Sequence, residues 1–591
     1  MTNSPLLESP LRELALWDWP AWLMTAPVVL PLIGALIYAL VGWRGSTRWV
    51  GVVSAACVLA AAIAIAVGVT ASGPQVSFFG LLRVDALSAF LLIVIGTVAL
   101  ISAVATPSHL AVEVEAGRAD ERDCRRMVML VQVFLALMAV AVLAAGLGVV
   151  WVAIEATTIV TAFLVGQRRD RAAVEAAWKY VVICSTGIAL ALLGTFLLNF
   201  AAQHTASPSP GLDWVDLVAA APHLDPGVTR IAVALLIVGF GTKAGLAPLH
   251  AWLPDAYSQA PAPVSALMSG VLVSVAFYAV LRVKVIADAA LGPEFTRALL
   301  VVLALASLIL AASLLLGQRD YQRMLAYSSI ENMGLVALGA AIGSPLAIAA
   351  VLLHLFGHGL VKSSLFVGAG RILQVTGSSR IDRVRGLAAR EPLLAGCFGF
   401  AVLAIIAFPP FALFASELGI ARAGFAAGMG WQLATALLLV LVIAASLVNH
   451  TSRMLLGTPV AAVAAPSQAA ASKETVVDAA GLEAVDLAPI PAAGPFSSPP
   501  VAVRMLPARS AVVPARSAVV PAVAVASPIP AVVPIAIEVP GPTVADAHRS
   551  RPGAEIYAMG GALLTCAVLG LTLGPLGPLL AQATAIITRT P

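Results

Sequence analysis

Ionisable side chains that lie inside long apolar runs are the residues of this chain best suited to chemistry. Glu155 interrupts the run VVWVAIEATTIV, and Lys243 lies near the middle of LIVGFGTKAGLAPLHAWLPDA. A charge at the centre of a membrane helix costs roughly 2.5–3.5 kcal/mol on insertion scales, so such residues are retained where they pair, titrate or bind ions. Both are therefore candidates for proton transfer, and we expect a buried Glu155 to pair with Lys243 and hold the lysine protonated. The alternative for each is a charge that a neighbouring helix neutralises purely for packing.

A stripe of ionisable residues runs along VLLHLFGHGLVKSSLFVGAG. His354, His358 and Lys362 are spaced at i, i+4 and i+8, so one face of a helix presents all three. Imidazole titrates near neutral pH and passes protons in either tautomer. The stripe predicts a water-lined proton path, and the alternative is that the histidines only satisfy backbone carbonyls. It does not predict a metal site, because no carboxylate or cysteine stands nearby as a third ligand.

Two further charges complete the candidate set. Lys179, in EAAWKYVVIC, lies near the cytoplasmic entry of its helix, so proton transfer and simple extension to the membrane surface both stay open. Glu417 follows the two prolines of AFPPFALFASE, and Lys243 precedes the two prolines of GLAPLHAWLP. Backbone groups freed by proline inside a bilayer must face protein or water. Broken helices in corresponding positions of two halves indicate an inverted repeat with an ion site at the breaks.

The composition defines the elements that must position these residues. The 591 residues are 60% hydrophobic and 11% charged, whereas soluble chains carry about 25% charged residues. Lipid must therefore solvate the chain, and we expect an all-α integral membrane protein. Windows of about 20 apolar residues predict fourteen transmembrane helices. They centre on 24–42, 50–70, 86–106, 127–146, 148–166, 177–198, 230–256, 260–284, 297–316, 323–342, 345–370, 394–426, 431–455 and 556–582.

These windows predict a modular organisation with helices 7 and 12 discontinuous. The segments are an N-terminal segment (1–23), helices 1–3 (24–126), a first inverted five-helix repeat of helices 4–8 (127–284), a second of helices 9–13 (297–455), a loop (457–552) and helix 14 (556–582). The loop holds sixteen of the 39 prolines and repeats PARSAVV, so we predict a disordered or polyproline-like segment. It is either an inert insertion or a docking arm for a partner.

Charge and motifs restrict the topology and the function. Sixteen arginines fall in the loops after helices 1, 3, 5, 9 and 11, which predicts that these loops are cytoplasmic and that both termini lie outside. The acidic residues near the N-terminus are not typical of a signal peptide, so we predict that this segment is not cleaved. A net charge of +4 without a basic stripe disfavours nucleic acid. The five cysteines form no CxxC pair, and nucleotide-binding glycine motifs are absent, so we expect no catalytic, cofactor-binding or metal residues.

Four motifs together resemble a known family. The run GFGTKAGLAPLHAWLPDAYSQAPAPVSALMSGV, with RVDALSAF, DYQRMLAYSSIENMG and HGLVKSSLFVGAG, is similar to the antiporter-like proton-translocating subunits of respiratory complex I and group 4 hydrogenases. The resemblance covers about residues 85–455 and is closest to the hydrogenase-4, formate hydrogenlyase type, component F subunit. It implies fourteen helices, an inverted repeat and a polar axis of buried charges. Glu155, Lys179, Lys243, Glu417 and the helix 11 stripe match family positions.

The resemblance also implies a function. The chain would be a non-redox, proton-pumping membrane subunit of a hydrogenase-4 or NADH-quinone oxidoreductase type complex, in a prokaryotic inner membrane. Its partners would be other membrane subunits and a soluble redox module on the cytoplasmic side. Ser274 stands where quinone-oxidoreductase members usually have a helix 8 lysine, and serine relays protons without holding a charge. Alternatives are a multisubunit cation/proton antiporter subunit and the membrane module of an inorganic-carbon uptake complex.

Overall fold

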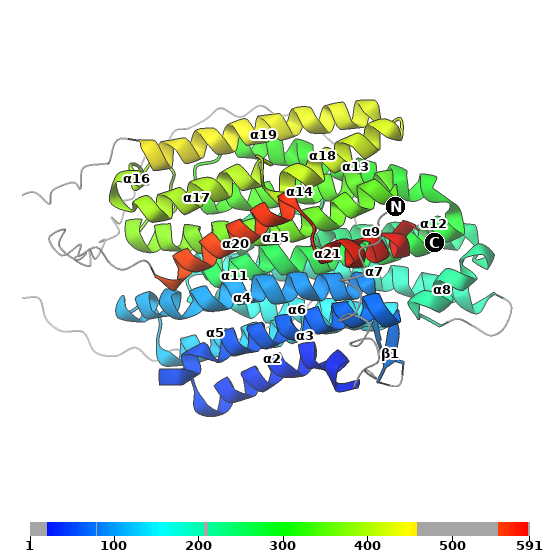
Figure 1. Ribbon diagram of the computed structural model, residues 1–591, viewed down its shortest axis with the longest axis horizontal. Coiled ribbons are helices and arrows are strands. Elements are labelled where there is room, and N and C mark those ends of the chain that lie inside the picture. Colours follow the sequence, from blue (N-terminus) through cyan, green and yellow to red (C-terminus); the bar gives the residue numbers. More distant parts are fainter. Residues whose placement is uncertain (1–20, 79, 206–210, 458–552, 589–591) are drawn as a thin grey trace, which may run out of the picture. The chain divides into compact units, whose positions relative to one another are not determined.

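Long apolar helices that pack side by side form the protein (Figure 1). The computed structural model describes residues 21–78, 80–205, 211–457 and 553–588. The chain divides into two units, residues 1–461 with 550–591, and residues 462–549. The second unit and nearly all of the predicted segments 1–23 and 457–552 lie outside the described residues, so the predicted loop stays a prediction.

Ten of the predicted spans are single helices. They are α2 (Ala21–Val41), α3 (Val50–Ser72), α4 (Ala86–Glu115), α5 (Glu121–Leu143), α6 (Leu147–Val165), α7 (Arg171–Gln203), α13 (Pro293–Leu316), α14 (Tyr321–Ile342), α15 (Pro345–Thr376) and α19 (Gly430–Leu456). Within the described ranges, thirteen helical segments are long and apolar enough to cross a membrane. The all-helical membrane fold expected from the sequence is therefore confirmed.

Helices 7 and 12 are discontinuous, as the sequence predicts. Helix 7 consists of α9 (Pro226–Lys243) and α10 (Trp252–Gln259), and helix 12 consists of α17 (Pro392–Ile405) and α18 (Ala412–Ala426). The prolines of both connections remove backbone donors and stop helix propagation. Because α17 and α18 are each short, the break explains why the length criterion finds thirteen spans where the sequence predicts fourteen. The inverted relation between the two five-helix units stays a prediction.

Two other spans are also irregular, which the sequence interpretation missed. Helix 8 consists of α11 (Ala262–Leu267), a π-helical turn (η4, Met268–Leu272) and α12 (Val273–Leu291). Helix 14, predicted as one span over 556–582, is α20 (Ala554–Leu571) followed by α21 (Leu576–Thr588). Pro575 lies between the last two helices, and Gly574 adopts a positive φ of 47° that ends a right-handed helix.

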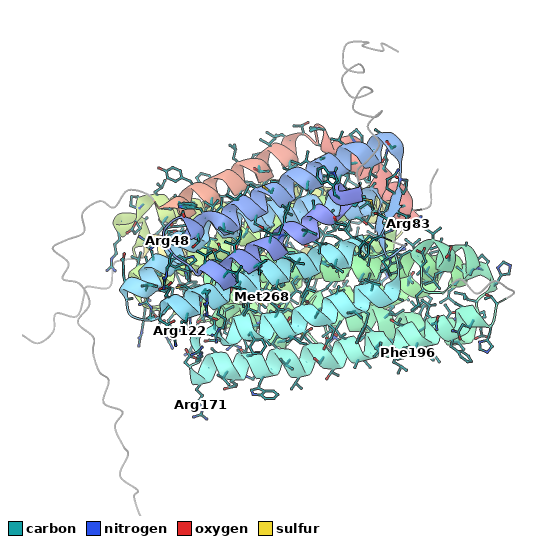
Figure 2. All side chains as sticks on the ribbon, turned by 90° about the horizontal axis from the view of Figure 1, so that it is seen from below. Arg48, Arg83, Arg122, Arg171, Phe196 and Met268 are labelled. Atoms are coloured by element: carbon teal, nitrogen blue, oxygen red, sulfur yellow. The ribbon has the colours of Figure 1, made fainter. Side chains whose placement is uncertain are left out.

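Short elements connect the spans. They are the 3₁₀ turns η1 (Gly45–Trp49), η2 (Gly166–Arg168) and η3 (Ala221–His223), the helices α8 (Trp214–Ala220) and α16 (Leu387–Arg390), and a hairpin of β1 (Gln75–Ser77) with β2 (Leu82–Val84). The two strands pair antiparallel, with Val76 opposite Arg83. Figure 2 shows Arg48, Arg122 and Arg171 at one end of the helices and Arg83 at the other end. Three of the predicted basic loops therefore share one side of the protein.

The central helices are shielded from lipid by the others. Helix α7 packs on α9, α13 on α14, and α15 on α18 and α20. Every residue of α14 except Arg323 is buried, and α12 is buried from Val273 to Ala287. Polar side chains of these helices consequently face protein rather than hydrocarbon, which lowers the cost of holding them at membrane depth.

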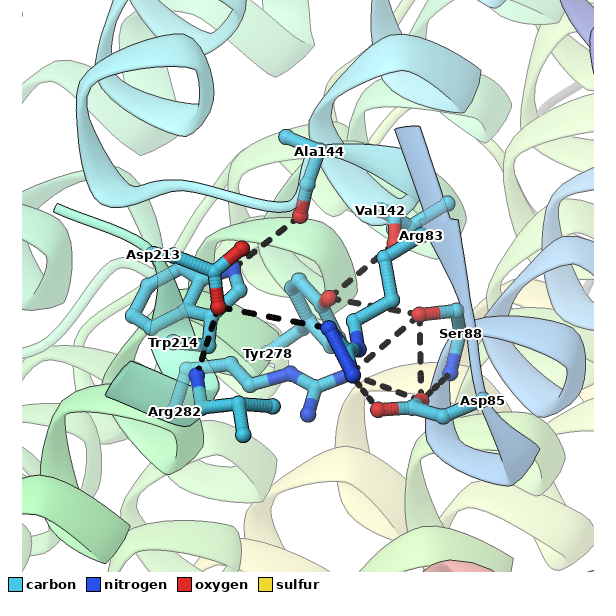
Figure 3. A network of polar contacts seen from close by, with 10 residues as sticks. Arg83, Asp85, Ser88, Val142, Ala144, Asp213, Trp214, Tyr278 and Arg282 are labelled. Atoms are coloured by element: carbon cyan, nitrogen blue, oxygen red, sulfur yellow. Dashed lines mark hydrogen bonds and ion pairs between the residues drawn. The ribbon is translucent and has the colours of Figure 1, made fainter. Parts of the chain in front are cut away.

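A buried ion pair fixes the start of α4 to α12 (Figure 3). Arg282 donates to both carboxylate oxygens of Asp85, at 2.7 and 2.6 Å, and both side chains are 8% exposed. Asp85 also caps α4 by accepting from the Ser88 backbone N–H at 3.0 Å. Burial alone would raise the pKa of Asp85, but the Arg282 charge and the Ser88 amide together lower it below its usual range. Tyr278, whose ring lies 5.0 Å below the guanidinium, donates to the Val142 carbonyl at 3.0 Å.

Replacing Asp85 by Asn tests this ion pair. We expect Asp85→Asn to destabilise the purified chain by about 3–5 kcal/mol, because Arg282 would keep a buried charge without its counterion. Adding Arg282→Gln to Asp85→Asn should recover part of the loss. Thermal unfolding in detergent measures both, with the exposed Asp216→Asn as the control. The contribution of Asp85 is present at neutral pH and disappears as pH falls below about 4, because its folded pKa is the lower one. Equal stability of Asp85→Asn and the wild type would refute the assignment.

Candidate functional site

Lys243 ends α9 at the break of helix 7 and is completely buried. Its Nζ donates to the Tyr180 hydroxyl of α7 at 2.7 Å and lies 4.8 Å from the centroid of the same ring. Trp252 of α10 donates its indole N–H to the Thr242 carbonyl at 2.9 Å, and the Ala247 amide donates to the Ser307 hydroxyl at 2.9 Å. Side chains thus satisfy backbone groups that the break leaves without helical partners.

Glu155 lies near this lysine without contacting it. The half-buried carboxylate of α6 accepts from Thr158 Oγ1 at 3.1 Å and from Ser185 Oγ of α7 at 3.3 Å. Among the described side chains, Lys243 is not within ion-pair distance of Glu155, so the direct pair expected from the sequence is not formed. Both charges instead contact α7, through Ser185 and Tyr180 respectively. Helix α7 therefore connects the two.

Lys179 belongs to an ion-pair cluster that is partly exposed at the protein surface. Its Nζ lies 2.7 Å from Glu175 and 3.0 Å from Asp255 of α10, and the side chain is 47% exposed. Asp255 also pairs with Arg323 of α14 at 2.9 Å, so one carboxylate joins α7, α10 and α14. The structure does not bring Lys179 to Lys243. This arrangement favours the surface interpretation of Lys179 that the sequence left open.

The residues around Lys243 form a first buried polar centre. A second centre lies where α14, α15 and α18 meet. Lys362 of α15 is fully buried, and its Nζ donates to the Leu325 carbonyl at 2.6 Å and to the Ser328 hydroxyl, both on α14. Two turns earlier on α15, His354 is also fully buried. One ring nitrogen lies 3.0 Å from Asn332 Oδ1 of α14 and the other lies 3.0 Å from Ser416 Oγ of α18.

Glu331 of α14 is the functional candidate that the sequence interpretation missed. It is 3% exposed, and its Oε2 accepts from the Asn332 side-chain amide at 2.6 Å. Since Asn332 also contacts His354, hydrogen bonds run from Glu331 through Asn332 and His354 to Ser416. A signal was present, because Glu331 is a lone carboxylate inside a predicted span, as Glu155 is. It was overlooked among the other polar residues of YSSIENMG.

Two predicted residues near this centre have buried polar atoms without a hydrogen-bond partner. Both ring nitrogens of His358 are unpaired, although the residue is fully buried between the turns that carry His354 and Lys362. Oε1 of Glu417, next to Ser416 on α18, is also buried and unpaired. An unsatisfied buried polar group costs about 1–3 kcal/mol. Water molecules could provide the hydrogen bonds that these atoms do not receive from the described side chains.

A line of aromatic and hydroxyl contacts joins the two centres. Four aromatic rings follow one another, and the distances between consecutive ring centroids are 5.1 Å from Tyr180 to Trp252, 5.9 Å from Trp252 to Tyr257 and 5.4 Å from Tyr257 to Phe366 of α15. In parallel, Ser269 of the π turn lies 3.0 Å from Ser329 of α14, between their hydroxyl oxygens.

Ser274 does not take part in that line of contacts. Its hydroxyl donates to the Gly270 carbonyl of its own helix at 2.9 Å, and the residue is fully buried. At helix 8, the hydroxyl that reaches α14 is therefore that of Ser269. Over residues 21–78, 80–205, 211–457 and 553–588, no three His, Cys, Asp or Glu side chains gather as a metal site would require.

Discontinuous helices, with a buried lysine at the end of one half-helix and a buried histidine that contacts the half-helix after the other break, are typical of ion-handling membrane proteins. Residues 144–445 match the family described as "NADH:quinone oxidoreductase/Mrp antiporter, TM". The chain belongs to this family, and the resemblance seen in its motifs is confirmed.

Similar proteins include several subunits of membrane complexes. The Hydrogenase-4 component F homolog of Methylacidiphilum infernorum is 34% identical over 404 residues, which cover 68% of this chain and 83% of the relative. NADH-quinone oxidoreductase subunit N of Desulforudis audaxviator is 38% identical over 242 residues, 41% of this chain and 47% of the relative.

Solved structures show the same fold. A chain of the membrane-bound sulfane sulfur reductase, an archaeal respiratory membrane complex, superimposes with a TM-score of 0.66 at 26% identity, covering 73% of this chain and 88% of that one. A chain of the Mrp complex from Dietzia sp. gives 0.65 at 24% identity, covering 74% and 81%. A chain of respiratory complex I from Thermus thermophilus gives 0.62 at 24% identity, covering 73% and 88%. The antiporter-like fold expected from the sequence is confirmed.

Asn332 organises the second centre, and replacing it tests the geometry. We expect Asn332→Leu to destabilise the chain by about 1–3 kcal/mol for each buried partner, Glu331 and His354, that it leaves unsatisfied. The melting temperature of the purified chain in detergent measures the effect. Asn449→Leu, on the exposed face of α19, is the matched control and should change little. If both substitutions had equal effects, Asn332 would not hold the network together.

Proposed function

We propose that this chain translocates protons as a membrane subunit of a redox-driven complex of the hydrogenase-4 or NADH-quinone oxidoreductase type. The observation that carries the proposal is the pair of buried lysines, each with a hydroxyl partner, at two centres that hydroxyl and aromatic groups connect. Lys243 contacts Tyr180, and Lys362 contacts Ser328 beside Glu331. The names of the similar proteins, component F of hydrogenase-4 and subunit N of an NADH-quinone oxidoreductase, support it.

Proton transfer in this proposal depends on the distances between buried charges. A buried lysine keeps its proton while a carboxylate is close and releases it more readily when that carboxylate moves away or is neutralised. Glu155 acts in this way on Lys243 across α7, and Glu331 acts on Lys362. The histidines of α15 and Glu417 pass protons between the second centre and the break of helix 12, because imidazole accepts and donates at different ring nitrogens.

The proposal also includes a location and partners. The chain would lie in a prokaryotic inner membrane, with the arginine-rich loops in the cytoplasm and both termini outside. Other membrane subunits of the complex would contact it, and a soluble redox module would bind on the cytoplasmic side. Electron transfer and its cofactors would reside in those other subunits.

Lys243→Ala in the assembled complex tests the proposal. Removing the ammonium should lower the rate of proton pumping at a given electron flux by at least about tenfold, because a positioned proton-transfer group contributes at least that much to the rate of its step. Electron transfer should continue. Proton uptake in inverted vesicles, measured beside electron flux, reports both quantities. Arg230→Ala is the control, because Arg230 lies on the same helix but is exposed.

The outcomes of this experiment separate the alternatives. Unchanged pumping per electron in Lys243→Ala would remove the lysine from the pathway and contradict the proposal. Transport that requires sodium and continues without electron flux would identify a cation/proton antiporter instead.

Glu331→Gln tests the second centre. Glutamine keeps an acceptor for Asn332 but cannot bind and release a proton near neutral pH, so pumping should fall while assembly is retained. The same vesicle assay measures the ratio of protons to electrons. Glu391→Gln, at the start of α17, is the matched control. A wild-type ratio in Glu331→Gln would show that this carboxylate has only a packing role.

A further inference from the structure

A polar cluster outside the two centres joins α4, α15 and α20 at the end of the protein where the arginine-rich loops lie. We call it the α4–α15–α20 cluster. Its members are Ser108, His109, Glu113, Arg371, Gln374 and Glu555. Glu555, in the first turn of α20, is 6% exposed although it is a carboxylate. Neither the sequence motifs nor the two centres account for it.

The Gln374 side chain has more partners than it can satisfy. Its amide nitrogen lies 3.1 Å from His109 Nδ1, 3.2 Å from the His109 carbonyl oxygen and 3.0 Å from Glu113 Oε1. An amide NH₂ group carries two hydrogens, so it cannot serve three acceptors fully at once. One of these acceptors is therefore always available to another proton donor. Of the three, only the ring nitrogen of His109 becomes a cation when it accepts a proton.

Glu555 is held on the other side of the cluster. Ser108, next to His109 on α4, donates to Glu555 Oε2, and Arg371 of α15 lies 3.6 Å from Oε1. A cavity of about 10 Å³ remains between the two sides, lined by His109, Gln374, Arg371, Ser108 and Glu555. That volume holds about one water molecule. His109 and Glu555 therefore share a polar space of the size that a single bridging water needs.

The cluster contacts an exposed arginine on one side and shares helix α15 with the stripe on the other. Glu113 forms two hydrogen bonds with Arg118, whose side chain is 53% exposed. In the other direction Gln374 lies on α15, twelve residues beyond Lys362 and therefore about 18 Å along the same helix. The charged groups that act on His109 are Glu113 and Arg118 from α4 and the loop after it, Glu555 from α20 and Arg168 from η2.

We infer that the α4–α15–α20 cluster is the site at which the protein takes up protons from the side of the arginine-rich loops. The inference rests on the proposed function and adds the place at which protons enter the protein. A proton from bulk water binds His109 and makes it an imidazolium. It then passes across the bridging water to the Glu555 carboxylate, so His109 returns to neutral and Glu555 becomes a carboxylic acid. Arg371 and Ser108 hold Glu555 in position for this step.

His109→Gln and Glu555→Gln in the assembled complex test the inference. Both replacements keep hydrogen-bonding groups and remove the imidazole or carboxylate that would carry the proton. Proton pumping per electron at saturating redox substrate should fall at least about fivefold in each variant. The pumping rate should also become steeply dependent on pH on the uptake side, because direct supply from bulk water falls tenfold per pH unit once the local acceptor is lost. Glu555→Asp should restore part of the rate.

Glu115→Gln is the matched control, because Glu115 is exposed at the end of α4 and makes no contact in the cluster. It should keep the wild-type rate and pH profile. Assembly is checked by co-purification of the other subunits, and if Glu555→Gln fails to assemble, His109→Gln decides alone. Wild-type rates and pH profiles in His109→Gln would overturn the inference. If Lys243→Ala nevertheless stops pumping, the proposed function stands. If neither Lys243→Ala nor His109→Gln changes pumping, the proposed function itself fails.

Discussion

The cost of holding charged side chains at membrane depth is the constraint on which the structure depends. Lys243 and Lys362 have lost all contact with solvent, so each charge needs polar partners inside the protein. Because helices 7 and 12 are broken, α9 ends and α18 begins inside the bundle. The Thr242 carbonyl and the Ser416 hydroxyl are therefore available to form hydrogen bonds with side chains of other segments. Outer helices then keep lipid away from α12, α14 and α15. The buried charges therefore require both the helix breaks, which provide polar partners, and the outer helices, which exclude lipid.

Helix α14 is the element that joins the polar groups. It provides Ser328 to Lys362, Asn332 to His354 and Ser329 to the π turn of helix 8, and it also carries Glu331. The π turn widens helix 8 at Ser269, whose hydroxyl contacts α14. The hydroxyl of Ser274, in contrast, donates to the Gly270 carbonyl of its own helix. A helix so completely buried can hold this many polar residues because almost none of its surface contacts hydrocarbon.

Most of the fold could be predicted from the sequence, because apolar length and proline position report directly on spans and breaks. Lys243, His354 and Lys362 could be found as charges in apolar runs. Their partners could not, because contacts such as Lys243 to Tyr180 depend on how helices face one another. The expected Glu155–Lys243 pair failed for that reason, since α7 lies between them. Glu331 was overlooked among the neighbouring polar residues although it is a lone carboxylate in a predicted span. The π turn was missed because the residues Met268–Leu272 carry no distinct pattern.

The central claim is that protons pass between the two buried centres through groups that water connects. A high-resolution cryo-EM structure of the assembled complex in a lipid nanodisc tests it most directly. The account predicts ordered waters within hydrogen-bond distance of His358, Glu417 and Tyr257, forming an unbroken polar line from Lys243 to Lys362. Dry, tightly packed side chains between Tyr257 and Lys362, with no space for water, would contradict it.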